Sequence, residues 1–325
     1  NGEISVWEGI VQDGIVMNTD DMACVGCIDN IILSSTIGRN KALIPKEVLA
    51  TLIGATSKFI EKMADLEVRI VLAGGETADV GDIVRTADVG FTAFGRLKRK
   101  DLVINKIRSG QVIIGFESYG QSTYETEYNS GIGSNGLTMA RHELFHHDYA
   151  DKYEETYAPQ IDRKYVYTGK FKVDDNVIIG GRNHPIGKLA LSPTRTYLPV
   201  LNEILKNHKE SIHGIIHATG GGHTKVLKYC DAPVHILKDN LFEVPPIFDI
   251  IQKSTDTSLA EMYKVFNMGT RLELYIDAEA AASIIEISAI FNIRAQVIGR
   301  VEGSKDNSMS VTVITNTETL VYQEK

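Results

Sequence analysis

The sequence predicts a mixed α and β protein built from two domains. Its 325 residues exceed the roughly 100–200 residues of a typical single domain. Amphipathic helical segments and short strand-like runs occur in both halves of the chain. A basic, polar stretch at residues 98–110 is the best candidate for a hinge. We therefore expect one domain over residues 1–105 and a second over 106–325, each with two packed layers of secondary structure.

The first half predicts two helices followed by two strands. Ser5–Met17 fits helical spacing only in part, whereas Leu43–Leu66 is the clearest helix of the chain. Pro45 lies in the first turn of this second helix, and its apolar residues recur at the i, i+3, i+4 spacing of a buried face. Strand-like runs follow at Val68–Leu72 and Asp88–Leu97, with glycine-rich segments around them.

The second half repeats a mixed pattern around one irregular segment. Strands are predicted at Gln111–Phe116, Gly214–Ala218, Arg271–Ile276 and Ala295–Val301, and helices at Arg195–Leu205 and Ala278–Phe291. Residues 148–181 are polar, tyrosine-rich and without periodicity, so we expect an excursion from the domain there.

Composition and charge exclude several classes of partner. The 34 Lys and Arg residues against 42 Asp and Glu residues give a net charge of −8, which argues against nucleic acid or an anionic membrane. No run approaches the ~18 apolar residues of a membrane helix, and the first twenty residues do not predict a signal peptide. Three cysteines are not a disulfide framework, so we expect a cytoplasmic protein with small-molecule partners.

Two glycine-rich segments are candidates for binding phosphate. Residues 131–136 match the G-x-G-x-x-G pattern of dinucleotide-binding proteins, but a long polar stretch separates them from the preceding strand. Backbone amides that meet a phosphate at the start of a helix are the better interpretation. Gly220–Gly222 follow a predicted strand, where they form either a tight turn without ligand or an anion-binding loop.

Two further motifs favour metal sites only weakly. His142, Glu143 and His146 match the H-E-x-x-H zinc pattern, with Glu154 or Glu155 as a third ligand. A histidine-rich polar helix face is the simpler alternative. Cys24 and Cys27 form a C-x-x-C motif without a second pair, which indicates small buried residues rather than a four-cysteine zinc site.

Carboxylates beside regular elements predict a magnesium site. Asp20 and Asp21 close the first predicted helix, and Gly74-Gly75-Glu76-Thr77 follow a short strand that we expect to be buried. Mg²⁺ takes one or two carboxylates together with substrate phosphates. The alternative for each residue is a solvated turn.

Taken together, these segments resemble the phosphoribosylformylglycinamidine cyclo-ligases, or aminoimidazole ribonucleotide (AIR) synthases. The resemblance runs in order over nearly the whole chain. It rests on the segments Asp13–Asp21, Gly74–Asp79, Ser134–Gly136, Pro193–Tyr197, His217–Gly222, Glu261–Tyr263 and Phe266–Gly269. The pair HATGGG and EMYxxFNxG is the specific part of the resemblance, because GGET also occurs in wider relatives that phosphorylate other substrates.

The resemblance implies an α/β (α+β) protomer with an N-terminal ATP-binding domain and a mixed α/β C-terminal domain. Strands of the N-terminal domains would join two protomers in a homodimer. The implied reaction uses ATP and Mg²⁺ to convert formylglycinamidine ribonucleotide into aminoimidazole ribonucleotide, ADP and phosphate.

Site residues follow from the same resemblance. Asp21 and Glu76 would be the catalytic residues and the ligands of Mg²⁺, and Asp13, Gly74 and Gly75 would bind ATP. The implied substrate-binding residues are Ser134, Asn135, Gly136, Arg195, Thr219, Gly220, Gly221 and Gly222.

The chain departs from the family pattern at several points. Asp20 stands where Asn is usual, Arg271 replaces a glycine, and residues 121–133 form an insertion. The family's DGVGTK segment is absent before Asp13, and because the chain opens on Asn1-Gly2, we expect that an upstream part is missing. Two alternatives follow: a divergent relative that phosphorylates another amide or a carboxylate, and a nucleotide-binding protein without catalysis.

Overall fold

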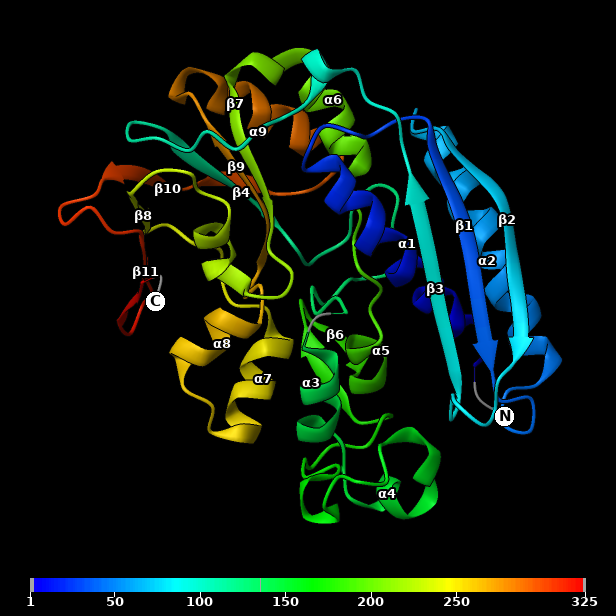
Figure 1. Cartoon of the computed structure of the whole chain (residues 1–325). Helices are drawn as coiled ribbons and strands as arrows, with labels where there is room; N and C mark the ends of the chain where they lie inside the picture. Colours follow the sequence, from blue (N-terminus) through cyan, green and yellow to red (C-terminus); the bar gives the residue numbers. More distant parts are fainter. Residues whose placement is uncertain (1–2, 135, 324–325) are drawn as a thin grey trace.

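A computed structural model describes residues 3–134 and 136–323 of the chain (Figure 1). The α-helices are α1 (Trp7–Ala23), α2 (Lys46–Asp65), α3 (Leu137–Leu144), α4 (Asp148–Lys152), α5 (Ile186–Ala190), α6 (Leu198–His208), α7 (Pro246–Thr255), α8 (Leu259–Val265) and α9 (Ala281–Ile290). The strands are β1 (Ile31–Arg39), β2 (Ile70–Asp79), β3 (Ala87–Phe94), β4 (Val112–Glu117), β5 (Asn176–Ile179), β6 (Arg182–Pro185), β7 (Ile212–His217), β8 (Val234–Lys238), β9 (Thr270–Ile276), β10 (Ala295–Gly303), β11 (Ser310–Ile314) and β12 (Thr319–Gln323). The predicted mixed α and β class is confirmed.

The first half forms a small sheet with helices on one face only. The strand order is β2-β1-β3, with β1 parallel to β2 and antiparallel to β3. Alternate residues of β1 point to opposite faces. Leu33 and Ile37 are buried with Leu52 and Phe59 of α2, whereas Ile32 lies on the opposite face and is 42% exposed. The outer face of this sheet is therefore open.

The second half is built on a seven-stranded sheet of order β12-β11-β8-β10-β4-β9-β7. Only the β11–β8 pair is parallel. A separate hairpin pairs β5 with β6. The predicted excursion at residues 148–181 contains α4 and has its own small cluster of buried residues, at one end of the molecule (Figure 1).

One apolar cluster joins the two halves. Ile15 of α1 and Phe59 of α2 belong to the same cluster as Phe116 of β4, Leu201 of α6 and Ile284 of α9. Helix α1 thus packs on the small sheet and on α6, which places its C-terminal end against the large sheet (Figure 1). This packing positions the functional site.

Two details of the predicted elements are wrong. The first helix, predicted over Ser5–Met17 and closed by Asp20 and Asp21, continues to Ala23, so both carboxylates lie within its last turn. The second strand is not a short buried one. It runs through Gly74-Gly75-Glu76 to Asp79 as an exposed edge strand, and a register shift opposite Leu33 and Ser34 of β1 accommodates the glycines. Among the described residues, no helix is long and apolar enough to cross a membrane.

Candidate functional site

The site lies where the C-terminal end of α1 meets the end of β7 and the start of β9. His217, the last residue of β7, links the two other residues of a polar chain. Its Nδ1 lies 3.1 Å from Oδ1 of Asp21, and its Nε2 lies 3.1 Å from Nε of Arg271. His217 and Arg271 are buried, whereas the side chain of Asp21 is 59% exposed. Asp21 is therefore the member that a ligand can reach.

The hydrogen bonds assign the protonation state of His217. An arginine Nε–H can only donate, so Nε2 of His217 accepts and its Nδ1–H donates to Asp21. Burial and the charge of Arg271 lower the pKa of His217 to about 4, which fits this neutral form. Burial would raise the pKa of Asp21, but the bond from His217 and the charges of Lys225 and Arg271 lower it below its ordinary value. Asp21 is thus an anion with one oxygen, Oδ2, that is not bonded to another described residue.

Asp20 has a different role from its neighbour. It is 1% exposed, and its two oxygens accept from Oγ1 of Thr196, at 2.6 Å, and from N of Tyr197, at 2.8 Å. Both donors precede the first residue of α6, so Asp20 holds the start of that helix against α1. Burial raises the pKa of Asp20 to about 7, although the two hydrogen bonds lower it.

We expect the substitution Asp20→Asn to remove a pH dependence of stability. Because the folded-state pKa is raised, Asp20 contributes stability at acidic pH that is lost as the pH rises from about 4 through about 7. Wild-type protein should therefore lose roughly 2–3 kcal/mol from this group between pH 5 and pH 8. Urea unfolding at both pH values measures the difference, with Asp65→Asn as an exposed control. Parallel pH profiles for wild type and Asp20→Asn would contradict the assignment.

Asp13 and Ser134 meet through one threonine. Oδ1 of Asp13 accepts from N of Thr194 at 2.7 Å, and Oγ1 of Thr194 accepts from N of Ser134 at 3.2 Å. The structure thus brings the predicted substrate loop to α1. Asn135 was predicted in this loop and lies outside the described residues.

The two glycine loops line one cavity of about 360 Å³. Its walls are Gly136, Gly220, Gly221, Thr224, Lys228, Glu261, Lys264 and Val265. Gly136 precedes α3, and Gly221 (φ +105°) precedes the 3-10 helix Gly222–Lys228. The amides of Gly220 and Gly221 bond to no other described residue. Free amides, helix starts and two lysines favour an anion, although Lys264 is paired with Glu261 of the same wall at 3.5 Å.

Glu76 lies apart from Asp21. It pairs with Thr36 of β1 in register, and therefore points to the open outer face of the small sheet, as Ile32 does. Asp21 instead contacts His217 at the end of β7. Gly74 and Gly75 share the edge strand with Glu76. Within one protomer, the structure does not bring the two predicted Mg²⁺ ligands together.

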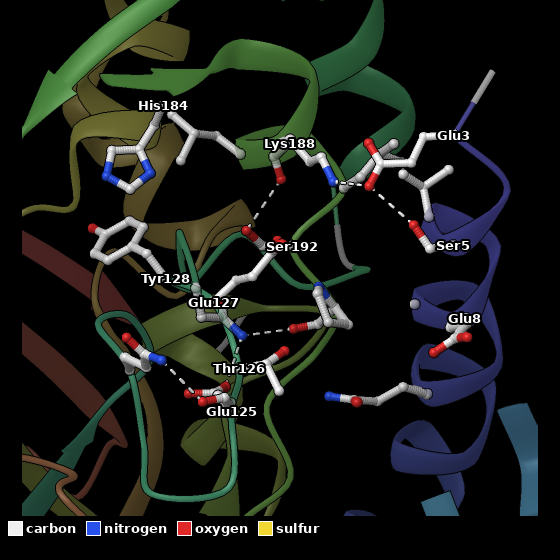
Figure 2. A pocket seen from close by; sticks show the side chains of 18 of the residues that line it. Glu3, Ser5, Glu8, Glu125, Thr126, Glu127, Tyr128, His184, Lys188 and Ser192 are labelled. Carbon is white, nitrogen blue, oxygen red and sulfur yellow. Dashed lines mark hydrogen bonds and ion pairs between the residues drawn. The ribbon is translucent and has the colours of Figure 1, made fainter. Parts of the chain in front are cut away.

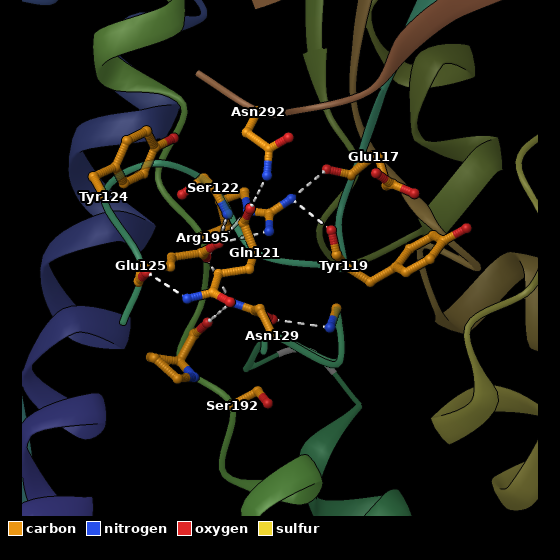
Figure 3. Close-up of polar contacts among 12 residues, drawn as sticks. Glu117, Tyr119, Gln121, Ser122, Tyr124, Glu125, Asn129, Ser192, Arg195 and Asn292 are labelled. Atoms are coloured by element: carbon orange, nitrogen blue, oxygen red, sulfur yellow. Dashed lines mark hydrogen bonds and ion pairs between the residues drawn. The ribbon is translucent and has the colours of Figure 1, made fainter. Parts of the chain in front are cut away.

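All three guanidinium nitrogens of Arg195 donate hydrogen bonds to other protein groups (Figure 3). Its Nε and Nη2 bond the carboxylate of Glu125, with the shortest distance 2.6 Å, and its Nη1 donates to the carbonyl oxygens of Glu117 and Tyr119. Its side chain is 1% exposed. Glu125 lies in the insertion at residues 121–133, so Arg195 anchors that insertion. A phosphate contact, which the sequence predicted for Arg195, would require these bonds to break.

A second cavity of about 610 Å³ lies between α1, α2, the insertion and α5 (Figure 2). Two ion pairs line it, Lys58–Glu8 and Lys188–Glu3, each at 2.6 Å. The ring of Tyr128 lies 5.0 Å from that of His184 at its edge. None of the predicted site residues lines this cavity.

The zinc hypothesis is wrong for the described residues. Helix α3 ends at Leu144, so His146 lies beyond it and does not share a helix face with His142. Nδ1 of His142 accepts from N of Tyr167, and Nδ1 of His146 lies 3.2 Å from Asp148. Over residues 3–134 and 136–323, no three His, Cys, Asp or Glu residues form a metal-binding group. Cys24 and Cys27 are free thiols; Cys27 is buried, as expected, whereas Cys24 is only partly buried.

Sequence reasoning missed the roles of four residues. His217 was noted only as part of the HATGGG segment, and Arg271 only as a replacement for glycine. No sequence pattern marked Lys228 or Lys264 as site residues, because single lysines on short helices are normally solvated. A basic residue at a family glycine was the one feature that pointed to the site.

Comparisons with known proteins match both halves of the chain to one family. Residues 3–97 match the family described as AIR synthase related protein, N-terminal domain, and residues 108–312 match its C-terminal domain. The chain is 31% identical to the phosphoribosylformylglycinamidine cyclo-ligase of Methanocaldococcus jannaschii, over 90% of this chain and 71% of that protein.

Solved structures share the fold at low identity. The E. coli hydrogenase maturation protein HypE aligns with a TM-score of 0.57 and 14% identity, over 97% of this chain and 79% of HypE. T. maritima PurL complexed with ATP aligns with a TM-score of 0.53 and 13% identity, over 96% of this chain. The chain spans only 40% of that longer protein.

Proposed function

Because this chain belongs to the AIR synthase related family, we propose that it catalyses the ATP-dependent closure of formylglycinamidine ribonucleotide to aminoimidazole ribonucleotide. The observation that carries the proposal is the meeting of two glycine loops, at Gly136 and at Gly220 and Gly221, in one cavity near the polar chain Asp21–His217–Arg271. This chain covers more than two thirds of the length of the M. jannaschii relative, which is named for this reaction.

The reaction needs a phosphate anchor and an activated amide. The ribose-phosphate end of the substrate would bind in the glycine-loop cavity, between the free amides of Gly220 and Gly221 and the ammonium groups of Lys228 and Lys264. ATP then phosphorylates the formyl amide oxygen, and ADP leaves. The neighbouring amidine nitrogen attacks the activated carbon and loses a proton, the C–O bond breaks, and phosphate departs as the ring closes. Such chemistry depends on positioning and on cations that offset phosphate charge.

Asp21 fits a magnesium ion bound to ATP. Its carboxylate is an anion on a side chain that is 59% exposed, and its Oδ2 bonds to no other described residue. Mg²⁺ keeps several waters and needs only one or two protein carboxylates in addition to phosphate oxygens. When bound there, the ion would neutralise charge on the transferring phosphoryl group. Asp13 holds Thr194 and serves the site as an anchor rather than as a ligand.

The direct test is turnover of formylglycinamidine ribonucleotide. Purified protein with ATP and Mg²⁺ should form aminoimidazole ribonucleotide and release ADP and phosphate in equal amounts. ATP hydrolysis without ring closure, or closure only with another amide or carboxylate, would favour the divergent relative. ATP binding without any turnover would favour the nucleotide-binding protein.

The substitution Gly221→Val should weaken the binding of the ribonucleotide far more than the binding of ATP. A valine at φ +105° is strained, so the loop and its amides must move, although the added Cβ would make only an ordinary contact with Cβ of Lys225. Loss of a charge-assisted hydrogen bond of about 1.5–3 kcal/mol should raise the KM for the ribonucleotide roughly tenfold or more. The KM for ATP should change little. Gly54→Val on the exposed face of α2, where a Cβ meets nothing within 4 Å, is the control. A larger effect on ATP would assign the loop to the nucleotide.

We further propose a homodimer joined through the outer face of the small sheet. Val71 and Phe94 are paired with Ile32 of β1, and these three apolar side chains are 42–64% exposed. The edge strands β2 and β3 also present unpaired backbone groups. A contact through this face would bury Glu76 at the interface, which is the arrangement in which Glu76 could still serve a site.

Light scattering at micromolar concentration should give twice the mass of the 35.8 kDa chain. Phe94→Asp should give monomers, because a buried charge without a partner is costly at an apolar interface. Ile290→Asp, at a 69% exposed isoleucine of α9, should stay dimeric. A monomeric mass for the wild type rules the dimer out.

A further inference from the structure

Arg271 is a buried cation with an unused donor. It is 2% exposed at the start of β9, and its Nε donates to His217. Its Nη2 is buried and has no hydrogen-bond partner. Leaving such a donor unsatisfied costs about 1–3 kcal/mol or more for a charged group, so its retention calls for an explanation.

A second unused polar atom lies in the loop that contacts Arg271. Oγ of Ser134 is also buried and without a partner. The preceding residue, Gly133, touches the guanidinium directly, because an added Cβ there would overlap Nη1 and would lie 3.1 Å from Nη2. Gly133 also has φ +60°. The loop at residues 131–134 is thus fitted to Arg271 and carries Ser134 next to it.

The surrounding carboxylates do not use the free Nη2. Asp13, Asp20 and Asp21 all act on Arg271 through their charge. Their hydrogen bonds go elsewhere, to Thr194, to Thr196 and Tyr197, and to His217. The carboxylates therefore stabilise the charge of the guanidinium, and none of them accepts a hydrogen bond from Nη2.

We propose that Nη2 of Arg271 and Oγ of Ser134 bind the phosphoryl group that ATP transfers to the substrate. This inference rests on the proposed function and adds two residues that contact the reacting group. A guanidinium and a hydroxyl match two oxygens of a phosphoryl group, and a charged donor in a water-poor site stabilises charge there strongly. His217 bonds Asp21 with one ring nitrogen and Arg271 with the other. The proposed phosphoryl site therefore lies next to the proposed metal site. Because both atoms are buried, the loop must move before the phosphoryl group can bind.

Kinetics test the role in turnover. Arg271→Met should lower kcat roughly 10²–10³-fold with little change in either KM. Ser134→Ala, which removes an unpartnered hydroxyl and leaves packing intact, should lower kcat by about tenfold. Arg271→Gly restores the residue usual in the family, and guanidinium added to solution should recover part of its activity. Full activity of Arg271→Gly without guanidinium would overturn the proposal.

Phosphate binding tests the site without the reaction. Calorimetric titration with inorganic phosphate should show binding to the wild type that weakens at least tenfold in Arg271→Met and in Ser134→Ala. Arg300→Met, at an exposed arginine of β10, is the matched control and should bind as the wild type does. Weakening in Lys228→Met but not in Arg271→Met would confine phosphate to the glycine-loop cavity and overturn the proposal, as would no binding by the wild type.

The two assays separate the proposals. If phosphate binding depends on Arg271 while formylglycinamidine ribonucleotide is not turned over, the proposed reaction fails and the phosphoryl site stands. If turnover occurs but neither kcat nor phosphate binding depends on Arg271, the proposed reaction stands and the phosphoryl site at Arg271 fails.

Discussion

Asp21→Asn should lower kcat by roughly 10³-fold while the protein stays folded. A metal ion on a transferring phosphoryl group supplies several kcal/mol of transition-state stabilisation, and that amount corresponds to such a factor in rate. Asparagine keeps an oxygen that can accept the Nδ1–H of His217 at the 3.1 Å position, so the substitution removes the charge and little else. The apparent affinity for Mg²⁺ should weaken in parallel.

The measurement is a Mg²⁺ titration of turnover, accompanied by urea unfolding. The free energy of unfolding should change by less than about 1 kcal/mol, because the side chain of Asp21 is 59% exposed and its hydrogen bond survives. Asp65→Asn, at an exposed carboxylate that ends α2, should leave both kcat and the Mg²⁺ dependence unchanged. Near wild-type kcat for Asp21→Asn at limiting Mg²⁺ would exclude this residue as a ligand.

Arg195→Met should destabilise the fold by about 3–5 kcal/mol, the usual cost of breaking a buried ion pair. The side chains of Arg195 and Glu125 are 1% and 10% exposed, so the substitution leaves a buried carboxylate and two carbonyl oxygens without their donor. Burial would raise the pKa of Glu125, but Arg195 lowers it below its ordinary value. In the variant the pKa of Glu125 should rise.

Urea unfolding at neutral pH measures the loss, and the double variant Arg195→Met with Glu125→Gln should recover part of it because no buried charge is left unpaired. Arg108→Met is the matched control. Arg108 also binds a carboxylate through two nitrogens, that of Asp231, but both side chains are exposed, so its loss should change stability far less. Equal losses for the two arginines would show that Arg195 does not anchor the insertion.

Local patterns predicted about half of the described helices and strands, because each of these depends on neighbours in the sequence. The stripe of α2 and the apolar runs of β4, β7, β9 and β10 are examples. Strand β1 carried no prediction, since its Ser-Ser-Thr centre lacks a clear apolar alternation. Strand β2 was expected to be buried, yet burial depends on what covers a strand. Its position at the sheet edge leaves nine of its ten residues exposed.

The sequence by itself determined the family and the reaction class, because ordered motifs survive as local residue patterns. Only the tertiary structure decided which of those residues act together. Asp20 and Asp21 are adjacent in sequence, yet the helical turn sends one to cap α6 and the other to His217. Arg195 and Arg271 are both buried arginines, and they differ in one respect. The donors of Arg195 are taken up by Glu125 and two carbonyls, whereas Arg271 keeps Nη2 without a partner, and that difference arises from contacts between residues far apart in the chain.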